Sequence, residues 1–161
     1  SELLPFFPAN YRLPNILSVT AIDEGRSGSR DEILPTSNYG TRSVAVAAQG
    51  KDVESTLPGG RYGQMTGTSQ ATAFGTATAA ILILQARDSG RPTTPEDLIE
   101  RIIVSSTSSD VLKGKTRTGA KLALRRALRF KGEASAIERQ GFAKALETEL
   151  ATRAKVTAYG L

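Results

Sequence analysis

Ser69 is the side chain whose type and setting are best suited to chemistry. It ends the tripeptide Gly67-Thr68-Ser69, which stands between a predicted hairpin strand and a predicted helix. A hydroxyl at a helix N-terminus lies beside free backbone N–H groups and the positive end of the helix dipole. There a serine could attack a carbonyl carbon while its own N–H holds the resulting oxyanion. Serine and threonine are also common helix caps, so the tripeptide by itself more often marks a structural cap than a nucleophile.

The composition lacks the usual partner of such a nucleophile. The 161 residues contain no histidine and no cysteine. A serine hydroxyl is a poor nucleophile without a base within hydrogen-bonding reach, and histidine is the commonest general base near neutral pH. A serine–lysine dyad is conceivable, but the lysines lie far along the chain from Ser69 in predicted surface segments. The chain on its own is therefore predicted to hydrolyse peptides negligibly.

The elements around Ser69 predict an α/β fold. Short runs of β-branched and small apolar residues are typical of buried strands, and Leu57-Pro58-Gly59-Gly60 between two such segments indicates a hairpin. From Thr68 to about Gln85, small or apolar residues occupy nearly every face, which predicts a helix buried on all sides. The predicted strands span residues 16–22, 43–48, 53–56 and 61–65.

The second half of the chain is predicted to be mostly helical. The tetrapeptide Thr94-Pro95-Glu96-Asp97 is a typical helix start, with a capping hydroxyl, a first-turn proline and first-turn acids. The predicted elements are a helix over 94–104, a hairpin over 113–119, and helices over 120–130 and 134–155. We therefore divide the chain into a domain over residues 1–130 and a helical extension of unknown role over residues 131–161.

The segment Gly67-Thr68-Ser69-Gln70-Ala71-Thr72-Ala73 closely resembles the Gly-Thr-Ser-x-Ala-Thr-Pro signature around the nucleophile of subtilisin-like serine peptidases, the subtilases. The resemblance covers about residues 5–130, in the right order. The other matching segments are FPANY (7–11), ILSVTA (16–21), SNYG (37–40), VAVAAQG (44–50), VESTLP (53–58), TGAKLA (118–123) and RAL (126–128). The family resemblance implies an α/β fold, namely the C-terminal portion of a three-layer αβα domain with a mostly parallel sheet, followed by a helical tail.

The resemblance also implies a role for each matching residue. Ser69 would be the nucleophile, with its backbone N–H as one oxyanion donor and the Thr68 hydroxyl assisting. Thr66 and Gly67 would lie beside the bound peptide, and Phe7-Pro8-Ala9 would form part of the wall of the S1 pocket. The family's aspartate, histidine and oxyanion asparagine would belong to a missing portion N-terminal to this chain. The implied activity is that of a serine endopeptidase acting on peptide or protein substrates through an acyl-enzyme.

Cofactors, partners and location follow mainly from the same resemblance. No cofactor is required, no metal-binding residue is assigned, and structural calcium is a common feature of relatives. The backbone carbonyls near Ala9 and Tyr11 resemble a cation-binding loop, although no carboxylate cluster demands calcium. No apolar run approaches the ~20 residues of a membrane span, so no membrane partner is predicted. The start, Ser1-Glu2-Leu3-Leu4, indicates a cut inside a longer protein. The family resemblance implies that this protein is secreted or lies in the cell envelope.

Three other interpretations stay open. Net charge is +5, and eight cations with no acid between residues 113 and 131 would suit nucleic acid. Only Phe130 adds an aromatic ring there, so a solvated basic face is favoured and no nucleic-acid partner is predicted. If the upstream portion lacked a functional histidine or aspartate, the protein would be a non-catalytic binding scaffold with Ser69 as a relic. Sedolisin-like peptidases use glutamate and aspartate with a Gly-Thr-Ser nucleophile, but the SNYG and VAVAAQG segments match subtilases better.

Overall fold

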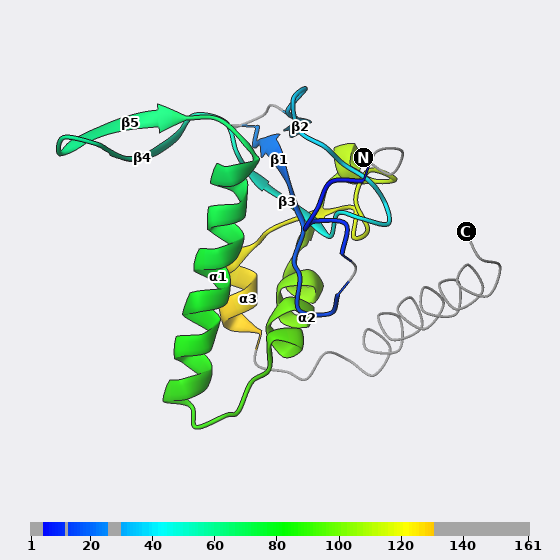
Figure 1. Cartoon of the computed structure of the whole chain (residues 1–161). Coiled ribbons are helices and arrows are strands. Elements are labelled where there is room, and N and C mark those ends of the chain that lie inside the picture. The colour runs from blue at the N-terminus through cyan, green and yellow to red at the C-terminus, as the bar shows by residue number, and fades with distance from the viewer. Residues whose placement is uncertain (1–4, 12, 26–29, 131–161) are drawn as a thin grey trace. The chain divides into compact units, whose positions relative to one another are not determined.

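The computed structural model describes residues 5–11, 13–25 and 30–130, which fold around a five-stranded mixed sheet (Figure 1). The strand order is β2-β1-β3-β7-β6, in which β1, β3 and β7 run parallel and the edge strands run antiparallel to their neighbours. The strands of this sheet are β1 (Val19–Asp23), β2 (Glu32–Ile33), β3 (Val46–Gln49), β6 (Thr107–Ser108) and β7 (Ala120–Lys121). The predicted α/β class with a mostly parallel sheet is confirmed.

Strands β1 and β3 form the buried centre of this sheet. Their buried residues are small or β-branched, which is typical of strands covered on both faces. The parallel register pairs Val19 with Val46 and Ala21 with Ala48. On the other edge of β1, the buried Ser37 hydroxyl accepts a hydrogen bond from the Ala21 N–H at 2.9 Å. Both strands begin later than their sequence patterns predict, and the two-residue strand β2 was not predicted.

The predicted hairpin is present as β4 (Val53–Leu57) and β5 (Arg61–Met65), which pair antiparallel along their whole length. At its turn, Gly59 and Gly60 adopt φ angles of +80° and +68°. These left-handed values carry no steric cost for glycine. Most hairpin side chains are exposed, and Figure 1 shows the hairpin projecting away from the five-stranded sheet.

Helix α1 (Thr68–Asp88) follows the hairpin and packs against β1 and β3. Its buried residues, Ala71, Gly75, Thr78 and Leu82, follow helical spacing along one face. The prediction of a helix buried on every side is therefore wrong for the described part of the chain, because the elements described there cover only this face. The opposite face, called here the outer face of α1, consists of Ala73, Ala77, Ala80, Ile81 and Leu84, all exposed.

Helix α2 (Pro95–Ser105) begins as predicted, with a complete capping box. The Thr94 hydroxyl accepts a hydrogen bond from the Asp97 N–H at 3.1 Å, and the Asp97 carboxylate accepts one from the Thr94 N–H at 2.8 Å. Helix α3 (Leu124–Arg129) is shorter than the predicted basic helix, because Ala120 and Lys121 form β7 and the helix begins only at Leu124. The three helices share a buried cluster of Leu82, Leu98, Ile102 and Ala127.

The other face of the sheet is covered differently. There Leu112, at the end of the 3-10 helix η1 (Asp110–Leu112), packs against Ile22 and Ala47. Within residues 5–11, 13–25 and 30–130 no α-helix packs against this face, so three layers are not seen. The predicted hairpin over 113–119 is instead a longer connection between the antiparallel strands β6 and β7. The predicted extension over 131–161 lies outside the described residues.

Part of the basic stretch is engaged within the fold. The Lys121 ammonium lies 2.8 Å from the Asp31 carboxylate, in a pair whose side chains are 25% and 11% exposed. The Lys113 ammonium lies 2.6 Å from the Asp110 carboxylate in a pair that is largely exposed. These pairs neutralise two of the eight cations in the stretch, and its role stays a prediction.

Candidate active site

Ser69 is the second residue of α1, and its side chain is exposed. Gly67 caps the helix in an extended conformation, with no capping side chain and no acid in the first turn. The first N–H groups of an α-helix lack a partner within the helix and carry the positive end of its dipole. The Ser69 hydroxyl and the N–H groups of Thr68 and Ser69 therefore share an accessible, positive helix end.

The beginning of α1 is fixed to the sheet by small side chains. Ala71, two residues after Ser69, is completely buried in a cluster with Ala21 of β1, Ala48 of β3 and Leu34. Because alanine is small, the helix backbone can approach the two strands closely at this point. The position of Ser69 is thereby tied to the two central strands rather than to a loop.

Gly50 supplies a second link between the sheet and the residues before Ser69. Its N–H donates to the Ile22 carbonyl at 2.8 Å, and its carbonyl accepts from the Gly67 N–H at 2.8 Å. A Cβ atom on Gly50 would lie 2.5 Å from the Ala21 Cβ and 2.8 Å from the Gly67 oxygen. Only glycine fits this approach, and the sequence pattern did not single out Gly50 for it.

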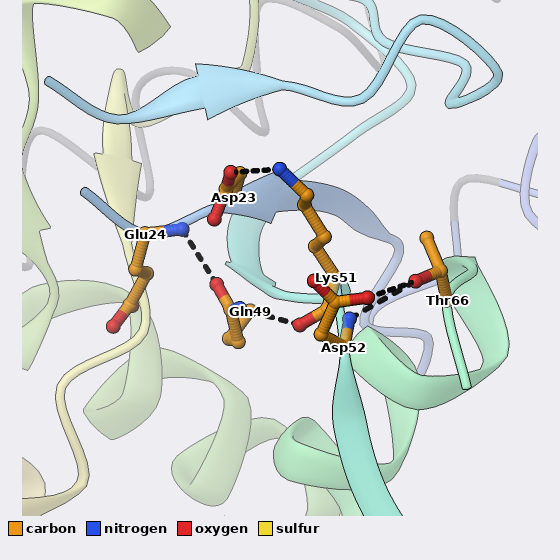
Figure 2. Close-up of polar contacts among 6 residues, drawn as sticks. All are labelled: Asp23, Glu24, Gln49, Lys51, Asp52 and Thr66. Atoms are coloured by element: carbon orange, nitrogen blue, oxygen red, sulfur yellow. Dashed lines mark hydrogen bonds and ion pairs between the residues drawn. The ribbon is translucent and has the colours of Figure 1, made fainter. Parts of the chain in front are cut away.

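Thr66, predicted to lie beside a bound peptide, is exposed at the end of β5. Figure 2 shows its hydroxyl facing Asp52, at the other side of the hairpin base. The Asp52 N–H donates to the Thr66 hydroxyl oxygen at 3.0 Å. Thr66, Gly67, Thr68 and Ser69 thus form one continuous segment at the carboxyl ends of β1 and β3.

Phe7-Pro8-Ala9 lies in an exposed loop at the other end of β1. The Phe7–Pro8 peptide bond is cis, and the Ser18 hydroxyl donates to the Ala9 carbonyl at 2.8 Å. Ser18 immediately precedes β1, whereas Gly50 bonds to Ile22 near its carboxyl end. Four strand residues span about 13 Å, so these two anchor points lie at opposite ends of β1. Its assignment to the S1 wall stays a prediction.

Histidine, the commonest general base near neutral pH, is absent from the sequence. Lys51, next to Gly50, lies 2.6 Å from the Asp23 carboxylate. The hydrogen bond and the charge of Asp23 raise the pKa of Lys51, so this lysine stays protonated at neutral pH and cannot accept the serine proton.

A calcium site is not evident in the described residues either. They contain no group of three or more acidic side chains close enough to hold a metal ion. The Ala9 carbonyl, part of the loop that resembles a cation site, already accepts the Ser18 hydroxyl. Structural calcium therefore stays an expectation from the resemblance, and no chemical step is derived from it.

Comparison of the sequence with known protein families shows which family the chain belongs to. The model of the subtilase family matches residues 6–142, most of the chain. The chain belongs to the subtilase family. The resemblance carried by the Gly67-Thr68-Ser69 segment is thus confirmed at the level of a family of serine proteases. Because the match runs past residue 130, the predicted domain boundary at that residue stays a prediction.

Three relatives of this subtilase are proteases by name. Subtilisin-like protease 2 of Plasmodium falciparum is 30% identical over 118 residues, which are 73% of this chain and 8% of that protein. The thermophilic serine proteinase of Bacillus sp. (strain AK1) is 41% identical over 83 residues, 52% of this chain and 19% of that protein. The extracellular basic protease of Dichelobacter nodosus is 36% identical over 101 residues, 58% of this chain and 16% of that protein.

Solved structures share the fold of this subtilase. A structure of the subtilase cytotoxin SubAB assembly aligns with a TM-score of 0.69 and 22% identity, over 80% of this chain and 43% of that chain. The prenylagaramide maturation protease PagA aligns with a TM-score of 0.63 and 25% identity, over 79% and 46%. The chain therefore spans less than half of these structures and under a fifth of the curated relatives. Among its described helices, none has the length and apolarity to cross a membrane.

Proposed function

We propose that this subtilase chain is the nucleophile-bearing C-terminal portion of a serine endopeptidase domain, with Ser69 as the nucleophile. Family membership and the Gly67-Thr68-Ser69 motif support the proposal. The observation that carries it is the position of Ser69, whose hydroxyl is exposed at a helix N-terminus without an acid in its first turn. Such a helix end favours the negative charge that develops during attack on a carbonyl.

In the proposed reaction, the Ser69 Oγ attacks the carbonyl carbon of the scissile peptide bond, and its proton passes to a general base. The negative charge on the substrate oxygen is held by the Ser69 N–H, with the Thr68 hydroxyl assisting. The C–N bond then breaks, the leaving amine takes the proton from the base, and an ester remains on Ser69. Water, deprotonated by the same base, hydrolyses the ester and releases the carboxylic acid product.

The general base is proposed to lie in an N-terminal portion of the same domain, since this chain has no histidine. That portion would also supply the aspartate that orients the histidine and the asparagine of the oxyanion hole. The exposed outer face of α1 supports this, because a contiguous apolar helix face is normally covered by protein. Helices on the face of the sheet against which no α-helix is described would complete the three-layer αβα domain.

Peptides or proteins are the proposed substrates. Thr66 and Gly67, immediately before Thr68 and Ser69, are proposed to lie beside the bound peptide, and Phe7-Pro8-Ala9 is proposed to line the S1 pocket. A location outside the cell or in the cell envelope is proposed, supported by the relative named as an extracellular protease. Apart from structural calcium, no cofactor is proposed.

Casein hydrolysis by the full-length gene product tests this function, with Ser69→Ala and Ser89→Ala compared at equal concentration. Ser89 is a matched control at the opposite end of α1, where its hydroxyl donates to the Gln85 carbonyl at 2.8 Å. We expect S69A to lower kcat by on the order of a million-fold, the loss that removing the nucleophile causes in the related subtilisin. The S89A variant is expected to stay within about twofold of the wild type, as surface substitutions usually do.

Hydrolysis that survives S69A would rule out Ser69 as the nucleophile. A full-length product that is folded but hydrolyses nothing would favour the non-catalytic scaffold, in which Ser69 is a relic.

A further inference from the structure

Asp52 and Thr66 form a reciprocal pair at the base of the β4–β5 hairpin. They lie one residue before β4 and one residue after β5, so they extend the pairing of Val53 with Met65. The Asp52 N–H donates to the Thr66 Oγ1 at 3.0 Å, and the Thr66 hydroxyl donates to the Asp52 carboxylate at 3.4 Å. The pair therefore closes the hairpin at the point where the chain enters α1.

The backbone of Asp52 is in a conformation that needs support. Its φ of 50° lies in the left-handed region. Among the residues that the structure describes, every other residue with a positive φ is a glycine. Aspartate and asparagine tolerate this region better than other residues because their short polar side chains bond locally. The Asp52 N–H donates a hydrogen bond to the Thr66 hydroxyl oxygen, and this bond helps to hold the left-handed conformation.

The residues just before Asp52 are bonded to the end of β1, as Figure 2 shows for Gln49 and Lys51. The Gln49 side chain accepts from the Glu24 N–H at 2.5 Å and donates to the Lys51 carbonyl at 2.7 Å. The Lys51 ammonium binds the Asp23 carboxylate at 2.6 Å. The segment that ends at Asp52 is thus anchored to the end of β1, and Thr66 connects this anchored segment to the entry of α1.

We propose that Asp52 and Thr66 are positioning residues that set the backbone of Gly67 and, through it, the location of the Ser69 hydroxyl. This inference rests on the proposed function of Ser69. Gly67 is held on one side by its N–H bond to Gly50 and on the other by the covalent link to Thr66. Without its hydroxyl, Thr66 is no longer bonded to Asp52, and the restraint that Thr66 passes to Gly67 is weakened. A displacement of a nucleophile by about 1 Å can lower the reaction rate by as much as 100-fold.

Both residues are exposed, so their removal changes little of the buried core. A positioning role therefore predicts a loss in turnover per folded molecule that exceeds any loss of folded protein. Thr66 is also proposed to lie beside the peptide, but a role limited to that contact would raise KM and preserve kcat.

The test uses the full-length protein with active sites counted by fluorophosphonate titration, so that kcat refers to competent molecules. We expect Thr66→Val to lower kcat by about tenfold, with KM changed by less than about twofold. Thr66→Ser keeps the hydroxyl and is expected to restore kcat. Asp52→Ala is expected to lower kcat less than T66V, because the Asp52 N–H remains, whereas Asp52→Asn keeps an acceptor oxygen and is expected to behave as wild type.

Two further variants make the outcome decisive. Thr56→Val changes an exposed threonine in the same hairpin and is expected to leave kcat unchanged. The double variant D52A/T66V is expected to equal T66V alone, since Asp52 acts through Thr66. Unchanged kcat in T66V, an equal loss in T56V, or a loss that T66S does not restore overturns the positioning proposal alone. A wild type that neither hydrolyses peptides nor reacts at Ser69 overturns the proposed function and this inference with it.

Discussion

The Gly67 N–H donates a 2.8 Å hydrogen bond to the Gly50 carbonyl, which joins the residue before α1 to the residue after β3. Gly50 in turn donates to Ile22 in β1, so the entry of the helix is connected to both central strands of the sheet. This short path explains how an exposed residue such as Ser69 can be held in place by buried structure. It also makes the size of residue 50 critical.

Gly50→Ala is predicted to disrupt the site. The added Cβ would lie 2.5 Å from the Ala21 Cβ and 2.8 Å from the Gly67 oxygen, and both belong to the rigid core or backbone. We expect a loss of about 1–3 kcal/mol in the free energy of unfolding from overpacking, with a loss of hydrolysis at temperatures where the variant is still folded. Thermal melting and peptide hydrolysis of the full-length variant measure the two effects.

Gly75→Ala is the matched control for this substitution. A Cβ on Gly75 would meet its nearest neighbours, the side chains of Val19 and Leu17, at 3.5 and 3.6 Å, which is ordinary van der Waals contact. Because glycine within a helix is less favourable than alanine by about 0.5–1 kcal/mol, G75A is expected to be neutral or stabilising. Equal behaviour of G50A and G75A would contradict the role assigned to Gly50.

The ion pair of Asp31 and Lys121 is predicted to make stability depend on acid pH. Burial alone raises the pKa of the Asp31 carboxyl. Hydrogen bonds from Lys121 and Ser109, together with the Lys121 charge, lower this pKa by more than burial raises it, so the net pKa is below the ordinary 3.8. The pair therefore stabilises the fold above the ordinary pKa, and this contribution disappears as pH falls through the lowered one. Asp31→Asn is expected to cost about 1–3 kcal/mol near pH 7.

Melting temperatures across pH 2–7 check this expectation. The difference between wild type and D31N is predicted to be largest near neutral pH and to shrink at pH values below the ordinary pKa of aspartate. Asp110→Asn is the control. The ion pair of Asp110 with Lys113 is mostly exposed, so this substitution should leave the melting temperature unchanged. A D31N deficit that stays constant down to the lowest pH would contradict a titrating ion pair.

The outer face of α1 is predicted to be buried in the full-length protein. Leu84 is 57% exposed in the described part of the chain. If an N-terminal portion of the domain covers it, Leu84→Glu places a charge in an apolar contact and should cost at least about 2 kcal/mol of stability. Thr56→Glu, on the exposed hairpin, should cost less than about 0.5 kcal/mol. Equal melting temperatures for the two variants would show that this face stays in water.

Local signals made much of the fold predictable. Leu57-Pro58-Gly59-Gly60 marked the hairpin because its glycines tolerate a positive φ, and Thr94 marked the start of α2 because its hydroxyl caps the helix. The exposure of the outer face of α1 was not predictable, since an apolar helix pattern does not reveal which elements are present to cover it. The sheet's short strands β2, β6 and β7 were missed because they contain only two residues each.

The candidate site shows the same division between local and distant information. The motif around Ser69 is contiguous and was recognised from sequence. Gly50 was not, because its restriction arises from Ala21 and Gly67, which are distant along the chain. Asp52 and Thr66 carried a weaker signal. Once Val53 is paired with Met65, the residues that flank the hairpin must face each other.

The most direct test of the central claim is the covalent labelling of Ser69 by a fluorophosphonate in the full-length gene product, followed by peptide mapping. Such reagents react with serine hydroxyls that a neighbouring base has activated. We predict one label per molecule, located on Ser69, lost in S69A and kept in S89A. A folded product that takes up no label, or takes it up at another residue, would contradict the assignment of Ser69 as the nucleophile of this subtilase.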